Sequence, residues 1–237
     1  MTTTTHGAVT APIGARAQGG PPLWALGVAY TALMIAGVAT MAAMPQPTAP
    51  AADLLAYQQS HIGTQRLGAF LLFGSAMPLA IYGATAYRRL RQLGVTAPGT
   101  AIGLAGGLLA AGSLALSGLI AWTRAGTADT ADPAVAKLLA QLLFATGGVG
   151  FAVPFALLVA GIAVPTLILR LLPRALAWSG LVIAGIGVLA SVTLLTAALD
   201  PALPVTRFAG AAWLIAAGVL LPRSRARRNL AATLAGA

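Results

Sequence analysis

Residues 66–91 read RLGAFLLFGSAMPLAIYGATAYRRLR, an apolar run from position 67 to 87 that ends on Arg88, Arg89 and Arg91. About 20 apolar residues in a helix cross the roughly 30 Å hydrocarbon core of a bilayer. Five other apolar segments have comparable length, at residues 23–44, 101–122, 138–169, 175–199 and a last one ending at Leu221. The sequence therefore predicts an all-α fold, a bundle of six transmembrane helices.

The charged residues between these segments are sorted by sign. All four acids, Asp53, Asp129, Asp132 and Asp200, fall in one set of alternate gaps. Loops rich in arginine and lysine are retained on the cytoplasmic side during membrane insertion. The other set of gaps, which includes both termini, contains no acid, so the sorting predicts that both termini are cytoplasmic. The arginines of this set are Arg16, Arg88, Arg89, Arg91, Arg170, Arg174, Arg223, Arg225, Arg227 and Arg228.

The composition excludes a soluble globular protein. The chain has 237 residues, of which 58% are hydrophobic and 8% charged, and its mean hydropathy is +0.87. The net charge of +10 lies in short loops beside apolar segments, where topology and anionic lipids explain it, so we expect no nucleic-acid partner. Lys137 is the only lysine and alanine is abundant, a usage typical of GC-rich bacterial genomes. We expect a multi-pass protein of a bacterial plasma membrane.

Three regions follow from this pattern. Residues 1–21 lack apolar periodicity and predict a disordered cytoplasmic tail, residues 22–222 form the transmembrane domain, and residues 223–237 form a basic cytoplasmic tail. The first apolar segment is longer than the roughly 7–15 residues of a secretory signal. We expect it to be retained as a span.

The fourth and sixth segments have unusual lengths. Lys137 and Arg170 would be about 50 Å apart in a continuous helix, against the roughly 30 Å needed to cross the bilayer. A long, tilted helix kinked near residues 147–154 is the favoured interpretation, and a discontinuous helix is the alternative. The sixth span must begin near Pro201 or Pro204, which draws Arg207 below the outer interface.

A weak internal similarity links residues 74–80 to residues 150–156. Three helical hairpins in parallel orientation would produce it, and so would the charge rule alone. Gly103 and Gly107 form a GxxxG pair, which is typical of close helix packing and which could also mediate homodimerisation.

Few residues could carry chemistry. The spans contain no Asp, Glu, Lys or His, which argues against proton coupling. His6 lies in the tail and leaves His61 alone, so neither haem nor zinc has its ligands, and the absence of cysteine removes thiolate chemistry. We expect no catalytic residues, no metal and no cofactor, and therefore no enzyme.

Polar residues gather at the predicted outer ends of the spans. Neighbouring antiparallel helices would bring these ends to one level and form a shallow cationic pocket for an anionic, amphipathic or lipid molecule. Asp53 and Asp200 are candidate ion-pair partners of Arg207, because a buried cation is costly when unpaired. The candidate ligand-binding residues are His61, Arg66, Trp122, Arg124, Gln141 and Arg207.

A simpler interpretation exists for most of these residues. Arg66 and Arg124 can be interfacial anchors whose charged ends reach toward water, Trp122 an interfacial aromatic residue, and His61 a loop or helix-capping residue. A second expectation concerns Ser75 and Tyr82 in the second span and the glycines at 147–150 in the fourth. These residues could line a small apolar cavity, although they more often allow close packing.

Three stretches carry a resemblance to a known family: residues 66–68, residues 79–90 and Leu172-Pro173-Arg174-Ala175-Leu176-Ala177-Trp178-Ser179-Gly180-Leu181. They resemble an uncharacterised bacterial multi-pass membrane family, common in actinobacteria and known only as a domain of unknown function. The resemblance implies a membrane bundle and carries over no catalytic residue.

Three functional interpretations remain open. The first is non-catalytic binding, or passive transport, of a small amphipathic, anionic or lipid molecule at the outer half. The second is a structural or regulatory subunit that docks onto another membrane protein or onto itself. The third, a membrane enzyme, lacks a set of acid, base, nucleophile and metal.

Overall fold

The computed structural model describes residues 20–223, and the elements of this part of the chain are helices joined by loops, with no β-strand. The tails expected at residues 1–21 and 223–237 lie almost entirely outside it. The elements are α1 (Leu23–Thr40), α2 (Ala51–Ser60), α3 (Ile62–Gln92), α4 (Gly99–Gly126), α5 (Pro133–Gly147), α6 (Val149–Ile168), α7 (Arg174–Leu189), η1 (Ala190–Leu194), η2 (Ala197–Leu199) and α8 (Ala202–Leu220).

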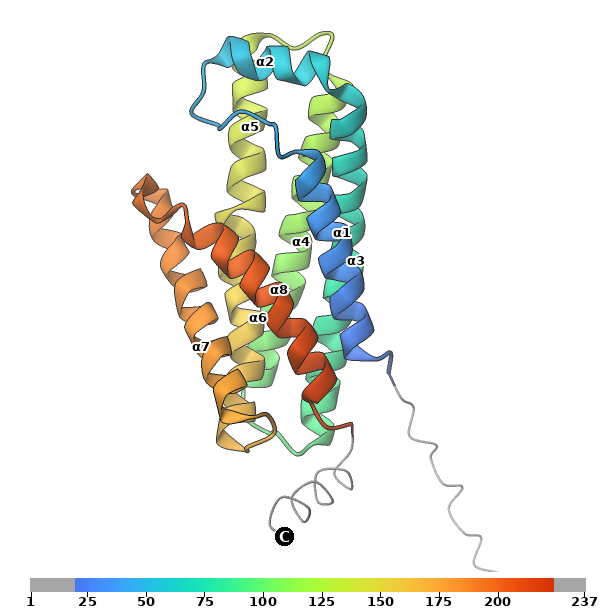
Figure 1. Ribbon diagram of the computed structural model, residues 1–237, viewed down its shortest axis with the longest axis vertical. Coiled ribbons are helices and arrows are strands. Elements are labelled where there is room, and N and C mark those ends of the chain that lie inside the picture. Colours follow the sequence, from blue (N-terminus) through green and yellow to red (C-terminus); the bar gives the residue numbers. More distant parts are fainter. Residues whose placement is uncertain (1–19, 224–237) are drawn as a thin grey trace, which may run out of the picture.

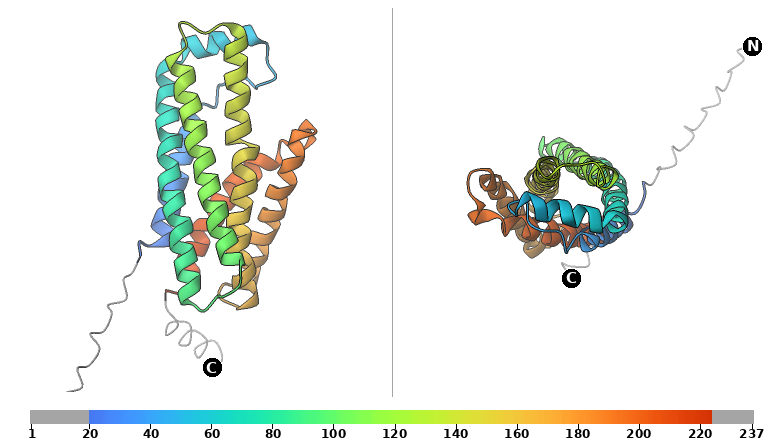
Figure 2. Two further views of the ribbon diagram at one scale, coloured as in Figure 1. Left: turned by 180° about the vertical axis from the view of Figure 1, so that it is seen from behind. Right: turned by 90° about the horizontal axis from the view of Figure 1, so that it is seen from above.

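Six segments in the described part are long and apolar enough to cross a membrane, which confirms the predicted all-α fold and its number of spans. Four of them are α1, α3, α4 and the pair α5 and α6. The fifth is α7 with η1, and the sixth is η2 with α8. The short α2 lies across one end of the bundle, as Figures 1 and 2 show, and joins α3 through a single residue, His61. We call this end of the molecule the α2 end.

Helix α4 lies between α3 and α6, while α1 packs on α3 and α8, and α7 packs at the periphery against α6 and α8. Buried aromatic side chains from α1, α3 and α6 fill the centre, among them Tyr30, Tyr82, Phe151 and Phe155. The Tyr82 hydroxyl donates a hydrogen bond of 2.8 Å to the Leu214 carbonyl of α8. The core therefore joins helices that are far apart in the sequence.

The predicted GxxxG pair packs within the chain. A Cβ added to Gly103 would lie 3.2 Å from the Gly161 Cα of α6, and one added to Gly107 would lie 3.4 Å from the Gly83 Cα of α3. Glycine at these positions lets the three backbones approach closely. The packing prediction is confirmed, and the faces of Gly103 and Gly107 are not free to mediate a homodimer.

The fourth span is interrupted, so the favoured prediction of a kinked but continuous helix is wrong. Helix α5 ends at Gly147 and α6 begins at Val149, because Gly148 adopts φ −86° and ψ −99°, outside the helical region. A Cβ at Gly148 would lie 2.5 Å from the Phe144 carbonyl oxygen, so this backbone geometry requires glycine. Figure 1 shows α6 following α5 along the same side of the bundle, so the two helices together make the fourth span.

The last two spans differ in how well their limits were predicted. The regular helix α7 ends at Leu189 and gives way to the 3₁₀ segments η1 and η2, so the fifth helix is shorter than the apolar segment at 175–199. Helix α8 begins directly after Pro201, as predicted. Its Trp213 donates a hydrogen bond of 2.8 Å to the Leu176 carbonyl and packs over Gly180, which holds α7 to α8.

Candidate functional site: a cationic cavity near the α2 end

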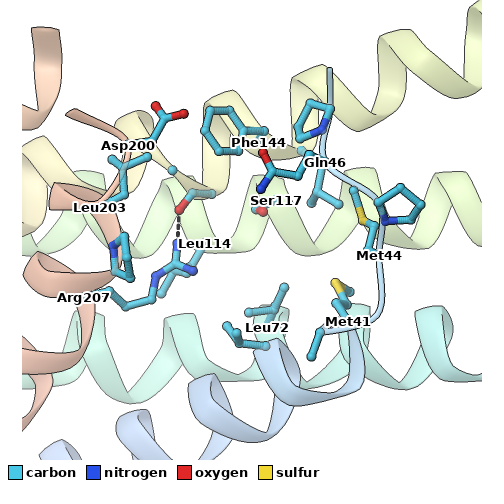
Figure 3. A pocket seen from close by; sticks show the side chains of 18 of the residues that line it. Met41, Met44, Gln46, Leu72, Leu114, Ser117, Phe144, Asp200, Leu203 and Arg207 are labelled. Carbon is cyan, nitrogen blue, oxygen red and sulfur yellow. Dashed lines mark hydrogen bonds between the residues drawn. The ribbon is translucent and has the colours of Figure 1, made fainter. Parts of the chain in front are cut away.

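A cavity of about 420 Å³ lies in the half of the bundle nearer the α2 end. Its walls come from the end of α1 and the segment that follows it, from Leu72 of α3, from α4, from the last turn of α5 and from the first turns of α8, as Figure 3 shows. Most of the wall is apolar. The residues that define its chemistry are Met41, Met44, Gln46, Leu72, Leu114, Ser117, Phe144, Gly147, Asp200, Leu203, Arg207 and Phe208.

Arg207 supplies the positive charge of this cavity. Its Nη2 donates a hydrogen bond to the Gly147 carbonyl (Figure 3), and its guanidinium carbon lies 5.1 Å from the centre of the Phe151 ring. Its Nε is buried and has no hydrogen-bond partner. The guanidinium is thus held in place by a carbonyl and an aromatic face, and it retains an unused donor.

The expected ion pair of Arg207 is not formed within residues 20–223. Asp200 lines the same cavity, but the guanidinium bonds to the Gly147 carbonyl in place of that carboxylate. Asp53 is exposed on α2 and does not line the cavity. The charge of Arg207 is therefore not neutralised by a carboxylate in the described part of the chain, because the helix break offers the side chain a different acceptor.

The break at Gly148 explains why that acceptor is available. In a continuous helix, the Phe151 amide would donate to the Gly147 carbonyl four residues earlier. Here the Phe151 amide donates to the Gly148 carbonyl instead, at 3.2 Å. The Gly147 carbonyl is thus released from the helix and is bound by Arg207, so the helix interruption and the cation form one structural unit.

Aromatic rings continue from Arg207 into the core. The Phe151 ring is stacked on Phe155 at 4.9 Å between centroids, and Phe155 lies 6.0 Å from Tyr30. The Tyr30 hydroxyl is buried and has no hydrogen-bond partner. Beyond Arg207, three buried aromatic rings thus extend into the core of the bundle.

The structure brings only two of the predicted site residues to the cavity, Arg207 and Asp200. His61, Arg66 and Gln141 are exposed elsewhere on the surface. His61 joins α2 to α3, with its Nδ1 2.7 Å from the Ser60 hydroxyl and its ring stacked on Tyr57. This placement agrees with the simpler interpretation of His61 as a residue of a helix junction.

Trp122 and Arg124 point to opposite sides of α4, because two residues in a helix are separated by about 200°. Trp122 is 61% exposed and lines a shallow apolar groove with Phe70, Phe73 and Leu119. Arg124 is only 1% exposed, and its Nη1 lies 3.0 Å from the Met44 sulfur. Arg124 is therefore not an interfacial anchor that reaches toward water.

The apolar cavity expected between the second and fourth spans does not exist as described. Ser75 is buried and bonds to the Leu72 carbonyl of its own helix, and Tyr82 is occupied with Leu214. Helix α4 lies between α3 and α6 and fills that space. Of the residues predicted there, the glycines at 147 and 148 do line a cavity, but α3 contributes only Leu72 to it and its other walls are α1, α4 and α8.

Several wall residues were not identified from the sequence. Met41, Met44 and Gln46 lie in the irregular segment after α1, which carries no recognisable motif. Ser117 lies on α4, and a Cβ on Gly147 would lie 2.7 Å from its hydroxyl. No pattern in the sequence indicates that Ser117 lies beside Gly147, because this contact depends on how two helices pack.

No protein-family model matches this chain, and neither a curated protein nor a solved structure matches it.

Proposed function

We propose that this protein is a non-catalytic, multi-pass protein of a bacterial plasma membrane that binds a small amphipathic, anionic molecule in the Arg207 cavity. The anionic group of the ligand bonds to the free donors of the Arg207 guanidinium. Its apolar part lies against the methionine, leucine and phenylalanine side chains of the wall. The family resemblance to actinobacterial membrane proteins remains a prediction.

The observation that carries this proposal is a cation inside the bundle with no carboxylate partner in the described residues. A charged side chain below the membrane interface costs a few kcal/mol unless it is paired. An anion that enters the cavity would offset this cost, and a buried arginine favours oxyanions because its donors match their geometry. The cavity volume of about 420 Å³ is in the range typical of small-molecule sites.

The surroundings of the cavity favour an amphipathic ligand over a purely polar one. Phe144 and Phe208 line it and are 40% and 42% exposed on the side of the bundle. An apolar tail could therefore pass between α5 and α8 directly from the bilayer. Methionine side chains adapt their shape readily, so Met41 and Met44 suit tails of differing form.

The orientation of the molecule is part of the proposal. Asp53, Asp129 and Asp132 lie at the α2 end, in or beside α2 and in the connection from α4 to α5. Arg88, Arg91 and Arg174 lie at the other end, around the connections from α3 to α4 and from α6 to α7. By the charge rule, the α2 end is outside and both termini are cytoplasmic. The cavity would then face the outer leaflet.

The alternative function, a subunit that docks onto another membrane protein, is less well supported. The small residues that could have formed a docking face, Gly103 and Gly107, pack against Gly161 and Gly83 inside the chain. We therefore favour ligand binding.

The proposal can be tested with three probes of equal chain length: dodecanoate, dodecanol and dodecyltrimethylammonium. Binding to the purified protein in an uncharged detergent is measured by the change in its tryptophan fluorescence. We expect dodecanoate to bind best. Arg207→Gln should reduce the preference for dodecanoate over dodecanol by about 10- to 100-fold, since a hydrogen bond to a charged group contributes about 1.5–3 kcal/mol.

The control variant is Lys137→Gln, which removes a cation of α5 at the same end of the molecule. Lys137 does not line the cavity. It should leave the preference unchanged. Equal binding of the three probes to the wild-type protein, or an unchanged preference in Arg207→Gln, would contradict the proposed function.

A further inference from the structure

A second group of buried polar side chains lies beneath α2, apart from the Arg207 cavity. It consists of Tyr57 and Gln58 of α2, Gln65 of α3 and Arg124 of α4, all of them buried. We call these four residues the Arg124 cluster. Buried polar groups in proteins are almost always hydrogen-bonded, so each unpaired atom among them requires an explanation.

The hydrogen bonds that the cluster does form fix the orientation of both amides. The Gln58 Nε2 donates to the Arg124 carbonyl at 2.7 Å, and the Gln65 Nε2 donates to the Gln58 carbonyl at 2.9 Å. The two Oε1 atoms are buried without a partner, and so are the Arg124 Nε, the Arg124 Nη2 and the Tyr57 hydroxyl. The cluster thus holds unused donors and unused acceptors.

The charge of Arg124 also has no partner within residues 20–223. The chain has only four acids, and Asp53, Asp129 and Asp132 are exposed, while Asp200 lines the other cavity. Arg124 bonds through Nη1 to the Met44 sulfur, which is a weak acceptor. A buried cation is strongly disfavoured without a counter-ion. The counter-ion must therefore come from outside the described chain.

The unused atoms indicate which chemistry would fit. Arg124 offers two unused donors. Burial raises the pKa of Tyr57, and the positive charge of Arg124 opposes this effect, so the Tyr57 phenol remains a donor at neutral pH. A bare carboxylate could accept these bonds but would leave the two glutamine oxygens unpaired. A phosphate group that also carries a hydroxyl can accept from Arg124 and donate to the glutamines.

The depth of Arg124 places the cluster near lipid headgroups. Helix α4 has 28 residues, about 42 Å at 1.5 Å per residue, against a hydrocarbon core of roughly 30 Å. Arg124 is two residues from the end of this helix. Met44 contacts Arg124 and also lines the Arg207 cavity. Rotation of the flexible Met44 side chain would therefore open a path to the Arg124 guanidinium.

We infer that the Arg124 cluster is a second binding site, separate from the Arg207 cavity, for a phosphate group that carries a hydroxyl. Arg124 and Tyr57 donate to the phosphate oxygens, and Gln58 and Gln65 accept from its hydroxyl groups. Met44 covers the site when it is empty. The same chemistry occurs in soluble phosphates and in phosphoglycerol lipid headgroups.

The test uses the full chain purified in an uncharged detergent. Thermal unfolding, followed by tryptophan fluorescence, is measured against increasing inorganic phosphate, glycerol 3-phosphate and sulfate at constant ionic strength. In parallel, native mass spectrometry compares the retention of phosphatidylglycerol and phosphatidylcholine. We expect a saturable rise of roughly 5–10 °C in Tm with glycerol 3-phosphate at 100 times its Kd, or selective retention of phosphatidylglycerol. A rise in Tm would identify a soluble phosphate as the ligand, and retention of phosphatidylglycerol would identify a lipid headgroup.

Three variants make the result specific. Arg124→Met replaces the cation by an apolar side chain of similar length, should fold at least as well as the wild-type protein without ligand, and should lose the response. Lys137→Gln should keep it, and Arg207→Gln should keep the response to glycerol 3-phosphate, which has no apolar tail, so failure of this site is distinguished from failure of the Arg207 cavity. The inference is overturned if neither phosphate source has an effect, if Arg124→Met responds like the wild-type protein, or if sulfate acts as well as phosphate.

Discussion

Replacement of Gly106 by alanine tests the packing of α4 against α6, on which the position of the cavity walls depends. A Cβ at residue 106 would lie 2.6 Å from the Leu158 nitrogen, 2.6 Å from the Pro154 carbonyl oxygen and 2.7 Å from the Leu157 Cβ. Ordinary contacts between such atoms are about 3.5–4.0 Å. Two of these atoms are backbone, so the helices themselves must separate by about 1 Å.

The expected loss of stability follows from two opposing effects. Overpacking of this kind costs about 3 kcal/mol when backbone has to move, whereas alanine gains up to about 1 kcal/mol over glycine in helix propensity. We therefore expect Gly106→Ala to lower the free energy of unfolding by about 2 kcal/mol, which corresponds to a fall in Tm of roughly 4–8 °C.

The matched control for Gly106 is Gly112→Ala in the same helix. A Cβ at residue 112 meets no atom within 4 Å, so this variant should unfold at or above the wild-type temperature. Thermal unfolding in detergent, followed by the fluorescence of the four tryptophans, measures both variants. If Gly106→Ala unfolds at the same temperature as Gly112→Ala, the close packing of α4 on α6 is refuted.

Two further predictions use the same assay. Tyr82→Phe removes the buried hydrogen bond to the Leu214 carbonyl and should cost about 1 kcal/mol, a fall in Tm of roughly 2–4 °C, and no fall would show that the bond is absent. Asp132 accepts a hydrogen bond of 2.8 Å from the Val135 amide at the start of α5, so Asp132→Ala should cost about 1 kcal/mol. Asp132→Asn keeps the acceptor and should unfold close to the wild-type temperature, and a loss equal to that of alanine would contradict the capping role.

The sequence predicts the number of spans and their approximate limits because hydrophobic length and charge sorting are local properties. The start of α8 after Pro201 and the role of Gly103 in helix packing were predicted correctly on the same grounds. The interruption at Gly148 was considered as the less favoured alternative, because glycines permit a break but do not require one. The feature that stabilises the break is the bond from Arg207, which comes from a distant part of the chain.

The candidate site was harder to predict because it depends on how each helix is rotated about its axis. The ends of α3, α4 and α5 do meet beside α2, whereas the connection from α7 to α8 lies further from that end, as Figure 1 shows. Even where helix ends share a level, the sequence does not tell which side of each helix faces the interior. Trp122 and Arg124 illustrate the difficulty, since one faces outward and the other is buried. The segment after α1 adds Met41 and Met44 to the cavity through irregular backbone, which no periodicity indicates.

The orientation of the bundle underlies the proposed outer-leaflet cavity, and cysteine labelling tests it most directly, because the chain contains no cysteine. Gln59→Cys places a thiol on α2, and Thr96→Cys places one in the connection from α3 to α4, both at exposed positions. A maleimide that cannot cross the membrane should label Gln59→Cys in intact cells and Thr96→Cys only after the cells are permeabilised. Labelling of Thr96→Cys, but not of Gln59→Cys, in intact cells would contradict the orientation.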